Sequence, residues 1–379
     1  MASGRKEIML VVGEASGDVH GARLVEALLK RDSELKIFGV AGEQLRRTDF
    51  EILFDVSEIS GMGLTELFGN LTKIWGAYRV LCRALRERRP ALLVLIDFPE
   101  FNLRLARLAK RLRVPVLYYV SPQIWAWRRG RVRQIARWVD RMAVIFPFEV
   151  PFYKKYGVDV TFVGHPLLET ISVREDRASL LTRLGLDPDK TTIALLPGSR
   201  RKEVAAHLPV MVDAARALNQ VEDAQFLCVR ASTVQSEDLA ALRDLREPRI
   251  PVVTEARYDA INAADLVWVA SGTATLETGL LLKPMVIMYR LSALTYWLAR
   301  LLVRVNYIGM VNLIAGERLV PELIQNELRP ERIVEESEAI LRHRETRASI
   351  IEKLAALRAK LGVSGASERV ADLALAMMV

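Results

Sequence analysis

An acidic residue stands where an apolar run of the chain ends. Asp97 directly follows residues 92–96, which predict a buried β-strand. In an open α/β sheet, functional groups gather beyond the carboxyl ends of the strands. Apolar surroundings raise the pKa of a carboxyl group towards neutrality, as a general base requires. From the residues alone, Asp97 is either such a base or a structural group, a helix N-cap or an ion-pair partner.

A second candidate site is a glycine turn beside an arginine. Gly198, Ser199 and Arg200 follow the apolar run 192–196 and precede a predicted helix. Backbone N–H groups at the helix start, together with the guanidinium, would bind a diphosphate. The segment lacks the G-K-[ST] ending of a Walker loop. A simple capped helix is the alternative interpretation.

A third candidate is the small-residue loop 270–277, which follows the apolar run 266–269. Ser271, Gly272 and Thr273 would let a ligand approach the next helix start, and Glu277 could accept both hydroxyl groups of a ribose. A capping box is the alternative, but it places the acid three residues after the cap, whereas Thr273 and Glu277 are four apart.

Two loops of the first half carry polar and aromatic groups. The loop 13–18 does not match G-x-G-x-x-G, and its two acidic residues would oppose a pyrophosphate. Glu14, Ser16 and Asp18 are expected to hold sugar hydroxyls, or Asp18 to cap the following helix. The stretch 120–128, with Ser121 and Trp127, precedes several arginines. It predicts a stacking and phosphate-binding ledge, a helix start packed on the core, or a single-stranded nucleic-acid site.

Alternating strands and helices must position these groups. Apolar runs predict strands at 8–12, 37–40, 92–96, 116–119, 141–145 and 160–163, and again at 192–196, 225–229, 252–253, 266–269 and 285–288. Helical periodicity lies between most of them and is clearest over 64–89. The pattern predicts two doubly wound, Rossmann-like parallel-sheet domains with ligands beyond the strand ends. The expected boundaries are 1–170, a linker 171–190, a second domain 191–340 and a helical tail 341–379.

Composition limits the class of protein. Among 379 residues, 54 Lys and Arg against 46 Asp and Glu give a net charge of +8, and 51% are hydrophobic. This excludes a disordered chain, and two cysteines, Cys82 and Cys228, exclude a disulfide-stapled one. The positive charge suits anionic partners. No metal is expected, because the four histidines are far apart and the Asp-Pro-Asp at 187–189 is typical of a turn.

Two apolar segments could contact lipid. No run reaches the ~18–20 apolar residues of a spanning helix, so a soluble, unprocessed chain is expected. Over 291–305 an apolar stripe that includes Leu298 and Leu302 lies opposite two arginines, which is typical of an interfacial helix or of a core-facing one. Met62, Leu64 and Phe68 could form a lip for acyl chains.

The segments 13–18, 96–102, 119–128, 197–200, 270–277 and 312–316, in this order and spacing, resemble the lipid-A-disaccharide synthase family. The resemblance extends from Ile8 to about Pro330. It implies an inverting, metal-independent glycosyltransferase of GT-B type that needs no cofactor. Such an enzyme transfers 2,3-diacylglucosamine from UDP-2,3-diacylglucosamine to 2,3-diacylglucosamine 1-phosphate. The products are a β-1,6-linked lipid A disaccharide 1-phosphate and UDP.

The resemblance also assigns residues and partners. It implies that Asp97 is the base, Arg200 the pyrophosphate ligand, Glu277 the ribose ligand and Asn312 a donor-site residue, with 13–18 near the acceptor. It implies that the tail 341–379 packs back on the first domain and can be exchanged in a homodimer. It further implies a peripheral protein on the cytoplasmic face of the inner membrane of a Gram-negative cell, with no nucleic-acid partner. A UDP-sugar epimerase of the same architecture, or a non-catalytic binder of anionic lipid or nucleic acid, are the alternatives.

Overall fold

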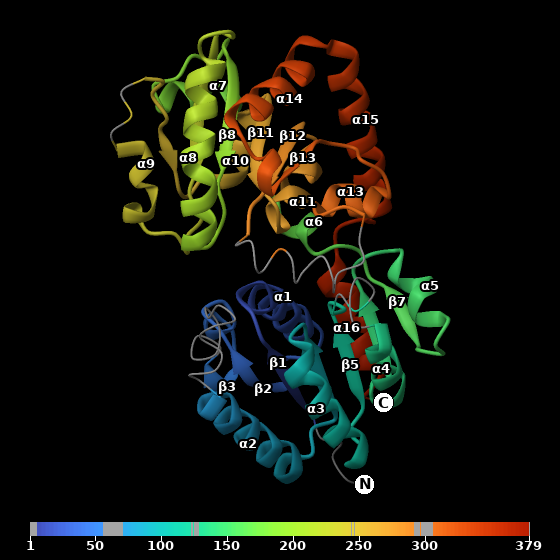
Figure 1. Cartoon of the computed structure of the whole chain (residues 1–379). Coiled ribbons are helices and arrows are strands. Elements are labelled where there is room, and N and C mark those ends of the chain that lie inside the picture. Colours follow the sequence, from blue (N-terminus) through green and yellow to red (C-terminus); the bar gives the residue numbers. More distant parts are fainter. Residues whose placement is uncertain are drawn as a thin grey trace. The chain divides into compact units, whose positions relative to one another are not determined.

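The chain forms two compact units in a computed structural model (Figure 1). The structure describes residues 6–55, 71–122, 124, 129–243, 245, 247–291, 296 and 306–378. The first unit comprises Met1–Glu169 and Leu361–Val379, and the second comprises Thr170–Lys360.

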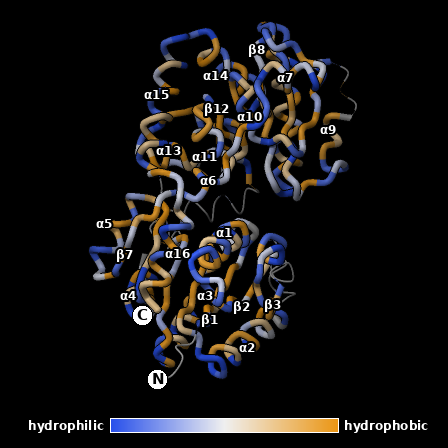
Figure 2. The backbone as a smooth tube through the Cα atoms, turned by 180° about the vertical axis from the view of Figure 1, so that it is seen from behind, coloured by the Kyte–Doolittle hydropathy of each residue, from blue (hydrophilic) through white to orange (hydrophobic). Residues whose placement is uncertain are grey.

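The first unit is built on a seven-stranded parallel sheet of order β3-β2-β1-β4-β5-β6-β7. The central strand β4 and residues 8–12 of β1 are apolar, because both faces of a parallel sheet are covered by helices. Figure 2 shows hydrophobic residues along the strands, whereas hydrophobic and hydrophilic residues alternate along the helices. The strands are β1 (Glu7–Val12), β2 (Lys36–Ala41), β3 (Glu51–Asp55), β4 (Leu92–Ile96), β5 (Val116–Tyr119), β6 (Arg141–Val144) and β7 (Val160–Phe162).

The helices of the first unit include one from the far end of the chain. This helix, α16, packs on α1, where Arg31 Nε donates to Asp372 at 2.7 Å and its guanidinium also pairs with Glu368 (Figure 1). The helices are α1 (Ala15–Arg31), α2 (Leu71–Arg88), α3 (Pro99–Arg111), α4 (Val132–Trp138), α5 (Glu149–Lys154), α6 (Leu167–Thr170) and α16 (Ala366–Ala376), with 3-10 turns η1 (Leu45–Arg47) and η4 (Arg129–Arg131).

The second unit repeats this design on a six-stranded parallel sheet of order β10-β9-β8-β11-β12-β13. Its strands are β8 (Thr191–Leu196), β9 (Ala224–Val229), β10 (Val252–Val253), β11 (Leu266–Ala270), β12 (Met285–Tyr289) and β13 (Glu322–Ile324). Its helices are α7 (Arg177–Arg183), α8 (Arg201–Leu218), α9 (Ala240–Arg243), α10 (Arg257–Ala263), α11 (Thr273–Leu280), α13 (Met310–Ala315), α14 (Pro330–Arg342) and α15 (Arg344–Lys360), with 3-10 turns η5 (Ser236–Leu239) and η6 (Gln325–Glu327).

The prediction of two doubly wound parallel sheets is confirmed. The unit boundaries differ from the predicted domains at two places. Residues 171–190 are part of the second unit rather than a linker, because α7 packs on α10 and Asp259 accepts the backbone N–H of Arg174 at 2.6 Å. Residues 341–360 also belong to the second unit, because α15 buries Leu354 and Leu357 and packs on α11 and α13. The predicted helix 64–89 is observed from Leu71 onward, and 64–70 lie outside the described residues.

Candidate active site

The backbone at Asp97 is held in an unusual conformation directly after β4. Asp97 and Phe98 have φ angles of 53° and 48°, a left-handed region that non-glycine residues rarely adopt. Two side chains fix the carbonyl of Asp97: Asn102 Nδ2 donates to it at 2.7 Å and Tyr118 Oη at 2.5 Å. Asn102 is fully buried. Such maintained strain is characteristic of functional positions, so the structure places Asp97 in a constrained loop.

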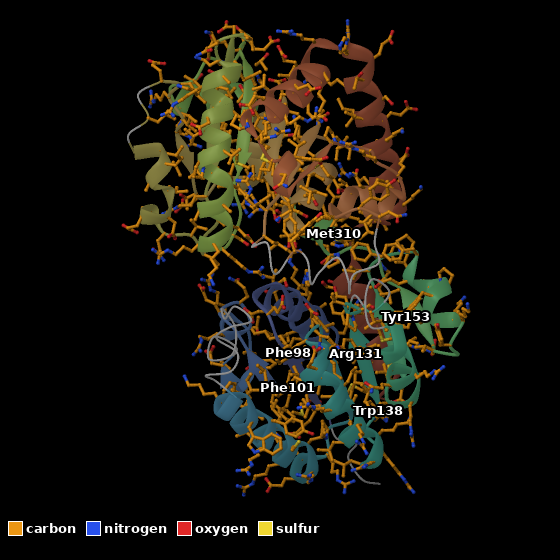
Figure 3. All side chains as sticks on the ribbon, viewed as in Figure 1. Phe98, Phe101, Arg131, Trp138, Tyr153 and Met310 are labelled. Atoms are coloured by element: carbon orange, nitrogen blue, oxygen red, sulfur yellow. The ribbon has the colours of Figure 1, made fainter. Side chains whose placement is uncertain are left out.

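The loop after β1 lies against this turn. A Cβ atom at Gly13 would lie 2.1 Å from Phe98 Cβ, so only glycine fits there. Phe98 stacks on Phe101 with ring centroids 5.3 Å apart, and Figure 3 shows the two rings together. Because β1 and β4 are neighbours where the strand order reverses, Asp97 and the loop 13–18 occupy the switch point of the first sheet, where such folds bind ligands.

The carboxyl group of Asp97 is shifted towards a neutral pKa. Burial, which desolvates the charged form, raises the pKa of Asp97 to about 6, and the negative charge of Glu14 adds to this shift. The backbone N–H of Phe98 acts in the opposite direction by bonding to the carboxylate. A carboxylate with this pKa is ionised at neutral pH and is a stronger proton acceptor than an ordinary aspartate.

The other predicted residues of the loop 13–18 divide into two kinds. Glu14 and Ser16 are exposed at the start of α1, and Glu14 makes no capping bond with its side chain. Asp18 is buried inside α1, and its carboxylate accepts the backbone N–H groups of Gly42, Gln44 and Leu45 at 2.7, 2.7 and 3.2 Å. Asp18 therefore does not cap α1, and its carboxylate anchors the turn after β2.

Of the remaining predicted residues of the first unit, Ser121 lies within the described part of the chain. Ser121 is buried after β5, and its hydroxyl bonds to Tyr153 Oη at 2.6 Å. Tyr153 lies on α5 (Figure 3). Trp127, Met62, Leu64 and Phe68 lie outside the described residues, as do Leu298 and Leu302 of the predicted apolar stripe.

The second unit brings its two predicted loops into one pocket of about 170 Å³. The loops follow β8 and β11, which are neighbours at the switch point of the second sheet, so their ends open onto the same edge. The pocket is lined by the predicted Gly198, Ser199, Ser271, Gly272, Thr273 and Glu277, and also by Glu203 and Arg257. The prediction that these loops share one site agrees with this geometry.

The start of α8 is already capped by an acid. Glu203 Oε2 accepts the backbone N–H groups of Ser199 at 3.0 Å and Arg200 at 3.3 Å. Gly198 makes room for this, since its φ is 133° and a Cβ would lie 2.6 Å from Glu203 Cβ. The predicted anion site at Ser199 is thus occupied by the chain itself. The Arg200 side chain is 80% exposed, and its Nη1 pairs with Glu203 Oε1 at 3.2 Å.

The start of α11 is not capped in this way. Gly272, with a φ of 154°, precedes the helix without a side-chain cap, and its position has open space around it. Within the described part of the chain, the backbone N–H groups of Gly272, Thr273 and Ala274 have no hydrogen-bond acceptor. Uncapped N–H groups at a helix start bind phosphate groups.

Glu277 is held by residues that the sequence did not reveal. Arg257 Nη2 forms an ion pair with Glu277 Oε2, and Tyr258 Oη donates to Oε1 at 3.2 Å. Arg257 and Tyr258 begin α10, twenty residues before Glu277, and no spacing rule connects two helices of different crossovers. The carboxylate retains lone pairs for further donors.

Asn312 does not line this pocket. It is fully buried, its Nδ2 donates to Val320 O at 2.8 Å and Glu322 Oε1 at 2.9 Å, and its Oδ1 accepts the N–H groups of Leu319 and Val320. Glu322 in turn accepts the N–H groups of Ile308 and Gly309 at 2.9 Å. Asn312 therefore supports the segment beside Ser271, whose hydroxyl donates to Ile308 O at 3.2 Å.

The described residues contain no group of His, Cys, Asp and Glu suited to a metal ion. None of the helices in the described ranges is long and apolar enough to cross a membrane.

Comparison with known proteins identifies the family. The model of the family described as "Lipid-A-disaccharide synthetase" matches residues 8–375. The lipid-A-disaccharide synthases of Syntrophus aciditrophicus and Geobacter metallireducens are each 46% identical, covering 98% of this chain and 98% and 97% of their own.

Solved structures share the fold at low identity. The UDP-GlcNAc 2-epimerase of Neisseria meningitidis bound to UDP-GlcNAc aligns with a TM-score of 0.66 at 12% identity, covering 98% of this chain and all of that one. MurG of Acinetobacter baumannii aligns with a TM-score of 0.59 at 14% identity, covering 98% and 99%. These likenesses establish the two-domain GT-B architecture alone. Because the family model and the relatives span nearly the whole chain, the resemblance predicted from the motifs is confirmed, and the chain belongs to the lipid-A-disaccharide synthetase family.

Proposed function

We propose that the chain transfers 2,3-diacylglucosamine from its UDP donor to 2,3-diacylglucosamine 1-phosphate, with Asp97 as the general base. Membership of the family makes it a hexosyltransferase of lipid A synthesis. The observation that carries the catalytic assignment is the desolvated Asp97 on a constrained backbone at the switch point of the first sheet. An epimerase or a non-catalytic binder is not favoured, because the relatives over this length are synthases.

Asp97 acts on the acceptor. Its carboxylate takes the proton of the 6-hydroxyl group as the hydroxyl oxygen attacks the anomeric carbon of the donor sugar. The bond between that carbon and the diphosphate breaks, and its electron pair leaves with UDP. A single displacement inverts the anomeric centre and gives the β-1,6 linkage. Ionisation of Asp97 at neutral pH, with a pKa of about 6, suits this proton transfer.

The second unit holds the leaving group. The free N–H groups of Gly272, Thr273 and Ala274 bind the diphosphate, and the exposed Arg200 guanidinium neutralises the charge that develops on it. Loss of one such preorganised donor typically lowers the rate by about 10²–10³-fold. No metal ion or cofactor is required by this scheme.

Glu277 completes the nucleotide site. Its carboxylate, oriented by Arg257 and Tyr258, accepts the ribose hydroxyls of UDP. Ser271 and Ser199 border the same pocket. Asn312 contributes by holding the segment 308–309 rather than by touching the nucleotide.

The partners follow from this chemistry. Acylated substrates are proposed to bring the chain to the cytoplasmic face of the inner membrane. A homodimer is proposed to form by exchange of the tail that carries α16, which would place the Arg31–Glu368 and Arg31–Asp372 pairs between chains. The reaction involves no nucleic acid.

The direct test is incubation with both acylated sugars and measurement of UDP release. We expect release that depends on both substrates, together with a disaccharide product. Formation of an epimeric UDP-sugar from the donor alone would instead identify an epimerase. Absence of any turnover, with steeply salt-dependent RNA binding, would identify a nucleic-acid binder.

A further inference from the structure

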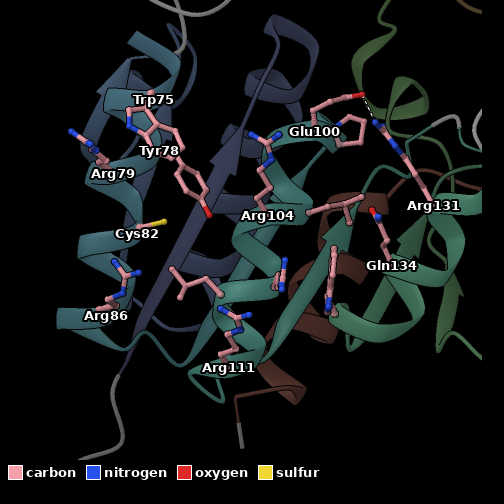
Figure 4. Close-up of a pocket in the computed structure, with 15 residues that line it drawn as sticks. Trp75, Tyr78, Arg79, Cys82, Arg86, Glu100, Arg104, Arg111, Arg131 and Gln134 are labelled. Carbon is pink, nitrogen blue, oxygen red and sulfur yellow. Dashed lines mark hydrogen bonds and ion pairs between the residues drawn. The ribbon is translucent and has the colours of Figure 1, made fainter. Parts of the chain in front are cut away.

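The first unit has a concave surface whose lining includes Pro99 and Glu100, just after Asp97 in the sequence. A groove of about 840 Å³ runs between α2, α3 and α4 (Figure 4). We call it the α2–α3–α4 groove. Its lining is dominated by guanidinium groups, contributed by Arg79, Arg86, Arg104, Arg107, Arg111 and Arg131.

Helical spacing brings these arginines to one surface. Arg79 and Arg86 are two turns apart on α2, about 10 Å along the helix axis. Arg104, Arg107 and Arg111 are spaced by three and four on α3, so they form one stripe facing the same groove. Figure 4 shows the side chains of Arg79 and Arg86 on α2 and of Arg104 and Arg111 on α3 lining this surface.

Most of the arginines of the groove have no carboxylate partner among the described residues. Within the described ranges, Arg131 is the one of the six with a carboxylate partner, Glu100 at 2.6 Å. By contrast, Arg88 of the same unit binds both Glu7 and Glu51. Gathered like charges repel one another, and a bound anion would relieve this repulsion. The groove is therefore suited to several phosphate groups at spacings of about 10 Å.

Aromatic residues at the rim distinguish between two kinds of polyanion. Trp75 is 51% exposed and stacks on Tyr78 with ring centroids 5.7 Å apart. The guanidinium carbon of Arg79 lies over the Trp75 ring, 5.5 Å from its centroid. The guanidinium carbon of Arg107 lies over the Trp138 ring, 5.8 Å from its centroid. Nucleobases bind by stacking on free ring faces, and here Tyr78 and Arg79 pack against the Trp75 ring and Arg107 against the Trp138 ring, which leaves less ring surface for stacking. Half-exposed tryptophans beside arginines are typical of surfaces that meet lipid headgroups.

We propose that the α2–α3–α4 groove binds the phosphate groups of anionic phospholipids, so that the first unit rests on a lipid surface through this face. Its lining residues are different ones from those of the segments 62–68 and 298–302, on which the sequence analysis placed lipid contact and which lie outside the described residues. The proposal does not depend on the glycosyl-transfer chemistry, because binding alone defines it.

The test is sedimentation of the full chain with vesicles. One variant replaces four groove arginines by glutamine (Arg86→Gln, Arg104→Gln, Arg107→Gln, Arg111→Gln). The matched control replaces four exposed cations of the same unit outside the groove (Arg133→Gln, Arg137→Gln, Lys154→Gln, Lys155→Gln), with the same change in net charge. All eight side chains are exposed, so both variants should fold, and thermal unfolding checks this.

The expected result is binding to phosphatidylcholine vesicles that contain phosphatidylglycerol, reduced about tenfold or more in the groove variant and much less in the control. Binding to phosphatidylcholine alone should be weak for all three proteins. Equal losses in the two variants would overturn the proposal, because net charge alone would then explain binding. Groove-dependent binding of inorganic polyphosphate or single-stranded RNA, without vesicle binding, would also overturn it. UDP release from detergent-dispersed substrates should be unchanged in the groove variant.

Discussion

Arg257 and Glu277 form an ion pair that joins the start of α10 to α11 at the pocket lined by the loops after β8 and β11. The guanidinium meets Glu277 Oε2, while Tyr258 Oη donates to Oε1. Within the described residues, Arg257 Nε is buried without a hydrogen-bond acceptor, so the pair is the main polar contact of this guanidinium. The pair orients the carboxylate that we propose to accept the ribose hydroxyls of UDP.

Replacing Arg257 should weaken UDP binding through Glu277. Arg257→Ala is expected to raise the Kd of UDP about tenfold or more, because Glu277 loses its orienting donor. Arg257→Lys keeps the charge but not the planar fork, so a similar loss would identify orientation rather than charge as the cause. Calorimetric titration with UDP measures the Kd of both variants. Arg342→Ala, which breaks another Arg–Glu pair of the unit, is the control, and an unchanged Kd in Arg257→Ala would refute the assignment.

Asp18 should matter for stability rather than for catalysis. Asp18→Asn removes one of the two oxygens that hold three backbone N–H groups, and we expect a loss of about 1–3 kcal/mol in the free energy of unfolding. Urea denaturation measures this, with Glu26→Gln on the exposed face of α1 as control. KM for the acceptor should stay constant in both. Full stability with a raised KM would instead place Asp18 in acceptor binding.

Gly198 should be intolerant of a side chain. Gly198→Ala combines a left-handed φ with a clash against Glu203, so it should destabilise the second unit and weaken UDP binding. Gly316 also has a left-handed φ, of 76°, but has nothing within 4 Å of its Cβ position. Gly316→Ala therefore reports the backbone strain alone, expected at about 1 kcal/mol. Equal effects of the two substitutions on unfolding and on UDP affinity would show that the contact with Glu203 is unimportant.

The strands were predictable from the sequence for a physical reason. The runs 92–96, 192–196 and 266–269 are the fully buried β4, β8 and β11, because parallel strands covered on both faces are apolar throughout. The carboxyl ends of such strands mark the sites, so Asp97, Gly198 and Gly272 could be found from these runs.

The tertiary roles were not predictable in this way. Asp18 and Asn312 have the residue types of ligand-binding groups, but their partners are backbone groups of other loops. Arg257 lies on a different helix from Glu277, and nothing in the local pattern connects them. The polar stretch 171–190 resembled a linker because its buried Leu180 and Leu181 are few among charged residues.

The raised pKa of Asp97 should be visible in stability. A carboxyl group with a pKa of about 6 when folded and about 3.9 when unfolded binds more protons in the native state between these values. The free energy of unfolding therefore falls as pH rises through this window. Asp97→Asn lacks this titration, so its stability relative to the unmodified chain should be greater at pH 8 than at pH 4.5. Urea denaturation at pH 4.5 and pH 8 measures the difference in the free energy of unfolding between the two proteins. The same difference at both pH values would contradict the raised pKa of Asp97.

The most direct test of Asp97 as general base is the pH dependence of UDP release, measured beside UDP affinity. The unmodified chain should show kcat/KM rising with pH and levelling above about 6, as the carboxylate ionises. Asp97→Asn should lose about 10²–10⁴-fold in kcat at every pH while its Kd for UDP stays within about twofold. An Asp97→Asn enzyme that retains most of its turnover, or one that loses UDP affinity together with turnover, would contradict the assignment of Asp97 as the base.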